Sequence, residues 1–168
     1  LHGGGYIVSW AIGHLVSLAQ PHEIRPEWKS WRRNTLPMLP ESWPLVVYDK
    51  TKDQFETVRK ILNSPKVERI VCATDAGREG ELIFNYIVQH VGSKKPVQRL
   101  WLQSMTPAAI REGFANLRSD SDMQPLADAA RCRSEADWLV GINGTRAMTA
   151  FNSKSGGFFL TTVGRVQT

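Results

Sequence analysis

One short segment constrains the fold of this chain more than any other: a β-branched run leads into a turn of acids and glycines and then into a helix. Val67 to Ala73 (VERIVCA) has the length and composition of a buried strand, and Thr74 to Gly80 is a polar turn. Across Glu79 to Val91 the apolar residues recur at helical spacing. The segment therefore predicts a strand, a tight connection and an amphipathic helix.

The same order is repeated further along the chain. Val97 to Leu102 predicts a second strand, and Thr106 to Leu117 predicts a second helix, with Thr106 as its N-cap and Pro107 as its first residue. Strand, helix, strand, helix implies parallel strands joined by right-handed crossovers. We therefore expect an α/β fold with a mostly parallel sheet, preceded by a helix over 51–62.

Three flanking segments are less regular. Tyr6 to Ala11 predicts a short strand, and Phe158 to Thr162 predicts another near the end of the chain. Gln20 to Pro44 is rich in Pro, Trp and Arg and has no period, so we expect an irregular surface excursion held down by its tryptophans. A boundary is expected near 118–122, followed by a long helix over 125–152 whose small residues would let another backbone approach closely.

Composition narrows the class of protein. Hydrophobic residues make up 42% and charged residues 22%, which is ordinary globular usage, and no apolar run reaches the ~18 residues that a membrane span needs. The net charge of +5 mildly favours a polyanionic partner. Cys72 and Cys132 are isolated, so we interpret them as reduced core thiols of a cytosolic protein.

The turn after the first predicted strand gathers three acids. Asp75 would lie at the strand tip, where open parallel sheets bind their ligands, and Glu79 and Glu81 would lie in the first helical turn. Carboxylates in such a crevice suit Mg2+, and Arg78 could pair with a phosphate. The alternative is that Asp75 caps the helix and the two glutamates favour its positive end.

Four ordered segments resemble the type IA DNA topoisomerases, specifically their topoisomerase III branch. IVCATDAGREGELIFNYI is similar to the acidic motif of the Toprim domain, and SWAIGHLVSLAQP to a Gly-His-Leu segment of the family. ADWLVGINGTRAMT resembles the helix that follows the Toprim domain, and TTVGRVQT resembles a DNA-contacting segment. The resemblance implies an incomplete Toprim domain lacking its first strand over 1–118, and the start of the helical DNA-strand-binding domain over 119–168.

The resemblance also implies a reaction. Enzymes of this family, which are isomerases, cleave one DNA strand through a 5′-phosphotyrosyl intermediate, pass another strand and reseal the break, with Mg2+ and without ATP. It implies Asp75 and Glu79 as metal ligands, and Glu79, Arg78 and Arg99 as catalytic residues. Many relatives have Asp-x-Asp-x-Glu, whereas Gly77 stands at the middle position here, so we hypothesise one Mg2+.

Two parts of that machinery are not expected in this sequence. The family's Toprim domain opens with a Glu-bearing strand, and its nucleophilic Tyr follows the Gly-Arg-Val-Gln segment; none of the three tyrosines of this chain has that context. We therefore expect an internal piece of a topoisomerase that does not cleave DNA alone.

The remaining site residues are candidate contacts to single-stranded DNA. Trp31 lies among three cations, an arrangement that lets a ring stack on a base while the cations meet phosphates. For His14 and Trp31, structural roles remain alternatives, and Arg133 and Asp137, four apart on a helix, could instead pair with each other. The candidates are His14, Trp31, Arg133, Asp137, Trp138, Arg146, Lys154, Thr162, Val163, Gly164, Arg165, Val166 and Gln167.

Other functions remain open at this point. Another Toprim protein, such as a primase, nuclease or recombination mediator, would share the acidic turn but not the later motifs, and a non-catalytic DNA-binding module would keep the cleft without the chemistry. A nucleotide-binding Rossmann domain is disfavoured because the turn lacks Gly-x-Gly-x-x-Gly. We expect a cytoplasmic, nucleoid-associated protein with single-stranded DNA as its partner, a helicase as a further candidate partner, and no membrane association.

Overall fold

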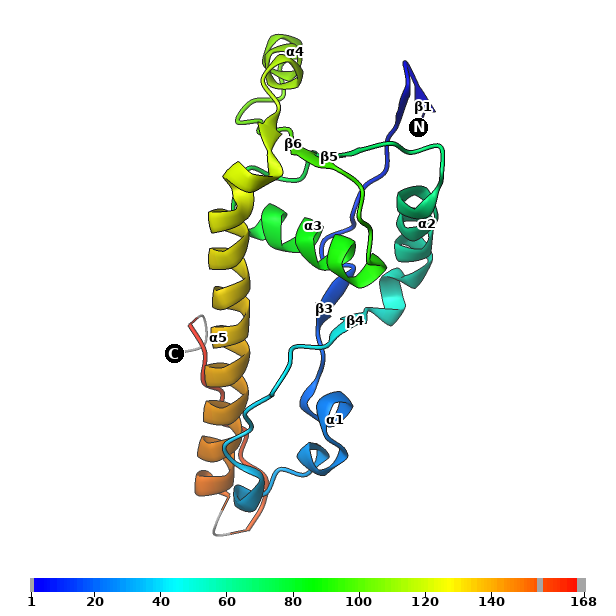
Figure 1. Ribbon diagram of the computed structural model, residues 1–168. Coiled ribbons are helices and arrows are strands. Elements are labelled where there is room, and N and C mark those ends of the chain that lie inside the picture. Colours follow the sequence, from blue (N-terminus) through cyan, green and yellow to red (C-terminus); the bar gives the residue numbers. More distant parts are fainter. Residues whose placement is uncertain (1, 154–155, 166–168) are drawn as a thin grey trace. The chain divides into compact units, whose positions relative to one another are not determined.

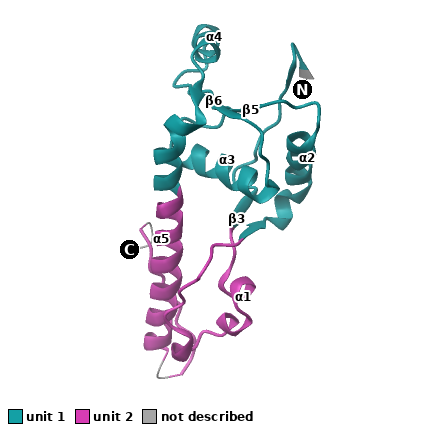
Figure 2. Cartoon of the chain, viewed as in Figure 1, with its two compact units in different colours: residues 1–17, 45–130 teal, residues 18–44, 131–168 magenta. Residues whose placement is uncertain are grey.

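The computed structural model describes residues 2–153 and 156–165, and the chain divides into two compact units (Figures 1 and 2). Unit 1 comprises residues 1–17 and 45–130, and unit 2 comprises 18–44 and 131–168. The excursion expected over 20–44 is therefore part of the second compact unit, together with most of the long helix.

The sheet of unit 1 is built as the strand–helix alternation predicts. Strand β5 (Ile70–Cys72) pairs in parallel with β6 (Val97–Arg99), in a register that places Cys72 opposite Arg99. A short third strand, β7 (Arg118–Ser119), pairs antiparallel with β6 and was not expected from the sequence. The parallel pair brings the carboxyl ends of β5 and β6 to the same sheet edge.

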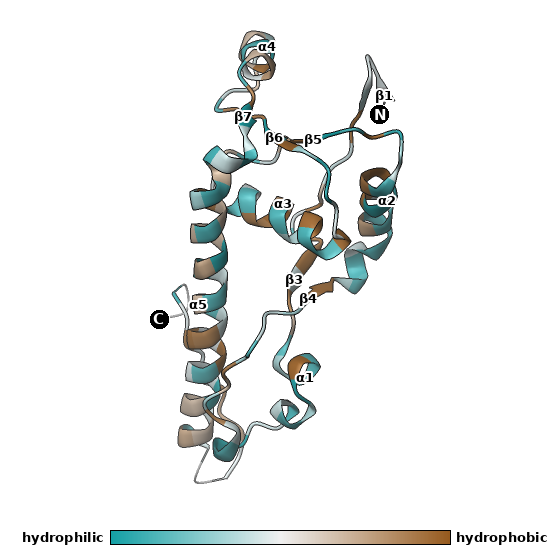
Figure 3. Ribbon diagram, viewed as in Figure 1, coloured by the Kyte–Doolittle hydropathy of each residue, from teal (hydrophilic) through white to brown (hydrophobic). Residues whose placement is uncertain are grey.

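Three amphipathic helices accompany this sheet: α2 (Lys52–Asn63), α3 (Arg78–Val91) and α4 (Pro107–Ala115). The core of unit 1 takes Phe55 from α2 and Leu82, Tyr86 and Ile87 from α3, and Figure 3 shows apolar residues along both helices. The Thr106 hydroxyl caps α4 by accepting from the Ala109 N–H at 3.3 Å. All three helices confirm the periodicity of the sequence to within a few residues.

The first part of unit 1 corrects one expectation. Strand β2 (Tyr6–Ile7) pairs only with β1 (His2–Gly3), and the predicted strand does not continue to Ala11. The reason is that β1 offers just two residues to pair with, so the apolar residues beyond Ile7 have no ladder to extend. Strand β3 (Val16–Leu18), paired with β4 (Leu45–Val47), is buried instead.

Unit 2 is organised around tryptophans. After the short helix α1 (Pro21–Ile24), the chain forms 3-10 turns at Pro26–Lys29 and Arg33–Thr35; a third lies in unit 1 at Asp49–Thr51. Trp28 and Trp138 are buried, and the Trp138 indole N–H donates to the Ala19 carbonyl at 3.0 Å. Trp43 packs edge-on against Trp138. Two of the three expected anchors, Trp28 and Trp43, therefore hold this segment in place.

Helix α5 (Asp120–Asn152) begins five residues earlier than predicted. Pro125 suggested a first helical position, but Ser119 and Asp122 form a reciprocal cap upstream of it. The Ser119 hydroxyl accepts from the Asp122 N–H at 3.2 Å, and the Asp122 carboxylate accepts from the Ser119 N–H at 3.3 Å. Cys132 on this helix is exposed, so only Cys72 is the buried thiol that we expected.

The segment that follows α5 is not the strand predicted for 158–162. Residues 158–165, which we call the strap, lie along α5 and hydrogen-bond to its side chains instead of to another strand. The Thr161 N–H donates to the Thr149 hydroxyl at 2.9 Å, and the Val163 N–H donates to the Thr145 hydroxyl at 2.9 Å. Val163 lies so close to Gly144 that a Cβ there would come within 2.9 Å of it, which confirms the close approach expected from small residues.

Within the described residues, no helix combines the length and the apolar character that crossing a bilayer requires.

Candidate active site and nucleic-acid contacts

The acidic turn packs backbone against backbone. Helix α3 starts directly after Gly77, and the Thr74 hydroxyl donates to the Gly80 carbonyl at 2.8 Å. A Cβ built on Gly80 would lie 2.2 Å from the Asp75 carbonyl oxygen, so no larger residue fits without a backbone shift. Gly77 differs, because its φ of 174° is ordinary extended backbone and a Cβ there meets nothing within 4 Å. The turn thus requires glycine at position 80 but not at position 77.

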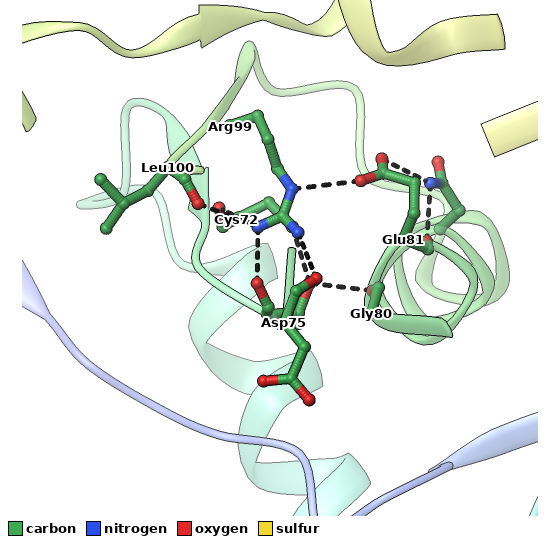
Figure 4. A network of polar contacts seen from close by, with 8 residues as sticks. Cys72, Asp75, Gly80, Glu81, Arg99 and Leu100 are labelled. Carbon is green, nitrogen blue, oxygen red and sulfur yellow. Dashed lines mark hydrogen bonds and ion pairs between the residues drawn. The ribbon is translucent and has the colours of Figure 1, made fainter. Parts of the chain in front are cut away.

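A buried guanidinium holds this turn from the β6 side (Figure 4). Arg99 is 1% exposed, and its Nε donates to the Glu81 carboxylate at 3.1 Å. Its Nη1 donates to the carbonyls of Cys72, Thr74 and Leu100 at 2.8–3.0 Å, and its Nη2 donates to the Asp75 carbonyl at 2.6 Å. All three nitrogens are therefore engaged by the protein itself.

Arg99, which the resemblance implies as a catalytic residue, is therefore buried beside the turn and bound by the protein itself. The same arrangement gives a structural role to Glu81, for which the sequence left open a place among the Mg2+-binding acids or a role as a helix-start acid. Glu81 is 3% exposed and also accepts from the Asn85 amide at 3.0 Å. The one feature of the sequence that pointed to this contact was the predicted parallel pairing of the two strands. In the observed register Cys72 lies opposite Arg99, and this brings Arg99 beside the turn. Burial next to this pair also raises the pKa of the Cys72 thiol, mainly through desolvation.

The other acids of the turn are open to solvent. Glu79 is exposed and its carboxylate contacts the Nε2 of His14, so the structure brings together two residues that lie 65 positions apart. Asp75 is exposed, and its carboxylate points away from the Arg99 guanidinium (Figure 4). Arg78, the first residue of α3, is also exposed. The accessible acids and His14 therefore share the carboxyl-end side of β5.

The oxygen donors of the acidic turn are few. Across residues 2–153 and 156–165, no three His, Cys, Asp or Glu side chains gather as a metal-binding group. Two accessible carboxylates, Asp75 and Glu79, nevertheless fit the preference of Mg2+ for one or two carboxylates with water in the remaining positions. The described residues thus suit a lightly held, hydrated ion rather than a closed protein cage.

Two of the expected DNA contacts on α5 are buried in unit 2. Trp138 is 8% exposed and packs against other tryptophans, and Arg146 is also 8% exposed. Arg146 donates to the backbone carbonyl of Trp28 and, at 3.3 Å, to that of Ser30, and desolvation lowers the pKa of its guanidinium. Both side chains therefore pack within unit 2, and their role in binding DNA stays a prediction.

Asp137 on α5 pairs with a residue of the strap. It accepts two hydrogen bonds from Arg165, one of them at 2.7 Å from Nε, and not from Arg133, the pairing that stood as the alternative to DNA contact. These bonds lower the pKa of the Asp137 carboxyl, with a smaller contribution from the charge of Arg133. The strap is the reason, because it runs beside α5 and delivers Arg165 to this carboxylate. Arg133 is exposed.

The remaining candidate DNA contacts differ in how exposed they are. Thr162 is exposed, whereas Val163 and Gly164 are half-buried. Trp31 is 40% exposed, with the Arg146 guanidinium 5.1 Å above its ring. Lys154, Val166 and Gln167 lie outside the described residues.

Comparisons with known proteins define the class of protein to which this chain belongs. A family model described as Toprim domain matches residues 1–105, and the chain belongs to that family. The chain is 48% identical over its whole length to DNA topoisomerase 3 of Bacillus subtilis (strain 168), covering 22% of that protein. It is 46% identical over its whole length to DNA topoisomerase 3 of Shouchella clausii, again covering 22%, and 50% identical over 86% of its length to that of Staphylococcus aureus (strain USA300), covering 20%.

These matches confirm the resemblance inferred from the four motifs. The matches to the Bacillus subtilis and Shouchella clausii proteins extend through residues 106–168, beyond the part that matches the Toprim model, so both the acidic turn and the long helix contribute to the similarity. The chain spans about one fifth of the length of these curated relatives.

Proposed function

We propose that this chain comprises the Toprim domain (1–118) and the start of the helical DNA-strand-binding domain (119–168) of a type IA DNA topoisomerase, and that it grips a single DNA strand beside a hydrated Mg2+ ion. The observation that carries the proposal is the acidic turn itself. Asp75 and Glu79 are accessible at the carboxyl end of β5, while a buried guanidinium binds the backbone carbonyls of Thr74 and Asp75. Open parallel sheets bind their ligands at this edge.

The residues of the turn divide into two roles. Asp75 and Glu79 would hold the metal, which when bound orients and neutralises a phosphodiester. His14 contacts one oxygen of the Glu79 carboxylate through Nε2, which leaves Oε2 free to face the metal. Arg78, exposed beside them, is placed to pair with a phosphate oxygen.

Arg99 is assigned a positioning role in this proposal rather than a contact to phosphate. Its guanidinium is almost fully buried and its nitrogens already serve five protein acceptors. A buried arginine that binds the Thr74 and Asp75 carbonyls fixes the path of the turn and thereby the direction of the Asp75 side chain. Removing it would act on the site through the backbone.

Residues of unit 2 would supply strand contacts. Arg133 on α5 and Arg165 at the end of the strap are exposed cations. Arginine contacts to DNA go mostly to its phosphate backbone. We propose single-stranded DNA as the substrate, action in the cytoplasm at the nucleoid, and a helicase as a partner. A primase, nuclease or recombination mediator is disfavoured because the similarity to DNA topoisomerase 3 continues past the Toprim match.

The binding half of the proposal is tested with this chain and a fluorescent 12-nucleotide strand. We expect saturable binding that weakens steeply as salt rises, with weaker binding to the matching duplex, because phosphate contacts release counterions. Arg133→Gln should reduce the salt dependence, whereas Arg111→Gln, an exposed cation on α4 of unit 1, serves as the matched control. Binding that ignores ionic strength, or equal affinity for duplex, would contradict the proposal.

The chemical half is tested in a protein of the relatives' full length that contains this chain. Asp75→Asn and Glu79→Gln should each raise the Mg2+ concentration needed for strand cleavage, because each removes one charged oxygen ligand. Asp53→Asn, an exposed acid on α2, is the control. An unchanged Mg2+ dependence in both site variants would argue against the assignment.

A further inference from the structure

Unit 1 carries an exposed arginine beside the acidic turn to which the roles above give no part. Arg118 is the first residue of β7, and the antiparallel register sets it opposite Arg99, the last residue of β6. Residues directly opposite each other in an antiparallel pair have their side chains on one face of the sheet. Arg118 therefore lies at the carboxyl end of β6, on the same face as the guanidinium that holds the turn. Because β7 was not expected, Arg118 was not among the candidate site residues.

A single tryptophan ring contacts both arginines. Trp101 follows β6 by two residues, and the guanidinium carbon of Arg118 lies 4.7 Å from the centroid of its ring. The guanidinium carbon of Arg99 lies 5.3 Å from the Trp101 ring, so the two guanidinium carbons are at most 10.0 Å apart. A planar guanidinium is attracted to the face of an aromatic ring. The ring thus holds Arg118 close to the residue that fixes the acidic turn.

The two arginines differ in what their N–H groups bind. Arg99 is buried, and its three nitrogens donate to Glu81 and to backbone carbonyls. Arg118 is exposed, and no residue that the structure describes accepts a hydrogen bond from its side chain. Contact with a ring uses the face of a guanidinium and leaves the N–H groups at its edge able to donate. Arg118 is therefore held in place while its donors stay available for a ligand.

The chemistry of this group and its place in the fold indicate a phosphate. The edge of a guanidinium matches two oxygens of a phosphate group and binds them through two parallel hydrogen bonds. Nucleotides of a DNA strand follow one another at about 3.4 Å along the helix axis, so a span of up to 10.0 Å corresponds to about three nucleotides. A strand with one phosphate at the acidic turn can therefore bring a nearby phosphate to Arg118.

We propose that Arg118, positioned by the Trp101 ring, contacts the backbone of a DNA strand within about three nucleotides of the phosphate held at Asp75 and Glu79. This inference rests on the proposed function, because it assumes that the turn holds a DNA phosphate. It extends the strand contacts, which so far involve Arg78 and residues of unit 2, along the sheet edge of unit 1.

The test measures how the affinity of the chain for a fluorescent dT12 strand depends on salt. Loss of one phosphate contact to single-stranded DNA should reduce the slope of log K against log salt concentration by about 0.7. Arg118→Gln should show this reduction, whereas Arg111→Gln, an exposed arginine on α4 of the same unit, should keep the slope. Arg118→Lys keeps the charge but loses the planar fork, so it should keep the slope and bind about 10-fold more weakly.

An unchanged slope in Arg118→Gln, with salt-sensitive binding by the unchanged chain, would overturn the contact and leave the proposed function standing. An equal reduction in Arg111→Gln would show a diffuse attraction and would also overturn the contact. Absence of binding by the unchanged chain at low salt would overturn both. Urea denaturation checks that the variants are folded; should Arg118→Gln unfold, Arg118→Lys decides, because an affinity equal to that of the unchanged chain would overturn the contact.

Discussion

The chain uses two charged pairs in opposite ways, and the contrast shows how burial decides what a charge can do. Arg99 and Glu81 in unit 1 are almost completely buried, and the arginine also binds four backbone carbonyls. Arg165 and Asp137 in unit 2 are both about half exposed and bind only each other in the described contacts. The first pair fixes a backbone path, whereas the second holds the end of the strap against α5 at the surface.

The largest difference should appear when the cation of the buried pair is removed. Arg99→Met leaves the Glu81 carboxylate buried without its partner, and breaking a buried pair costs about 3–5 kcal/mol of unfolding free energy. The midpoint of urea denaturation measures this loss. Arg111→Met, an exposed arginine of the same unit, should change it by less than about 0.5 kcal/mol. Equal effects of the two substitutions would show that burial of Arg99 does not matter.

Substitutions of the two glycines of the acidic turn should have different effects on stability. Gly80→Ala should destabilise the chain by about 1–3 kcal/mol, because its Cβ would overlap the Asp75 carbonyl. Gly77→Asp should be tolerated, since its Cβ meets no atom within 4 Å. It would also add the middle acid of the Asp-x-Asp-x-Glu pattern, so we expect tighter Mg2+ binding from this variant by calorimetry. A stable Gly80→Ala protein would contradict the backbone contact.

The strap of unit 2 should respond to the loss of one hydroxyl. Thr149 is 1% exposed, and its hydroxyl accepts from the Thr161 N–H. Thr149→Val keeps the shape but leaves that N–H unpaired, which costs about 1–2 kcal/mol. Thr162→Val, an exposed hydroxyl on the same strap, is the control. Hydrogen exchange of the Thr161 and Val163 amides should become faster only in the first variant.

The smallest effect is expected from pH at the exposed pair. The hydrogen bonds from Arg165 lower the pKa of the Asp137 carboxyl, so the pairing contributes fully above the ordinary carboxyl pKa. It is lost as the pH falls through the lowered value in the folded chain. A carboxyl carbon titration by NMR should therefore give a depressed midpoint that returns to normal in Arg165→Gln. An ordinary midpoint in the unchanged chain would show that the pair is not formed.

Much of unit 1 followed from the sequence because its signals are local. Helical spacing located α2, α3 and α4, and the β-branched run located β5 before the acidic turn. The Arg99–Glu81 pair was missed because it depends on strand register and on burial, which spacing does not encode. Arg165 was likewise expected to meet phosphate, and its pairing with Asp137 requires the strap to lie along α5.

The same division holds among the candidate site residues. Asp75 and Glu79 could be found from their place at the end of a strand, and they are accessible as that place requires. The contact of Glu79 with His14 joins residues 65 positions apart, and only the resemblance to a family with a Gly-His-Leu segment pointed to His14. Trp138 and Arg146 were proposed as DNA contacts because of their residue types, but both side chains are buried in unit 2. Residue type alone does not encode this burial.

We propose that the held turn presents Asp75 and Glu79 to one Mg2+ ion. It is tested most directly by titrating Mg2+ into the isotope-labelled chain and following the amide NMR signals of residues 74–79. The account predicts saturable shifts confined to this turn, abolished in Asp75→Asn and weakened in Arg99→Lys, while Asp53→Asn leaves them unchanged. Shifts that are absent, that spread over all acids alike, or that persist in Asp75→Asn would contradict it.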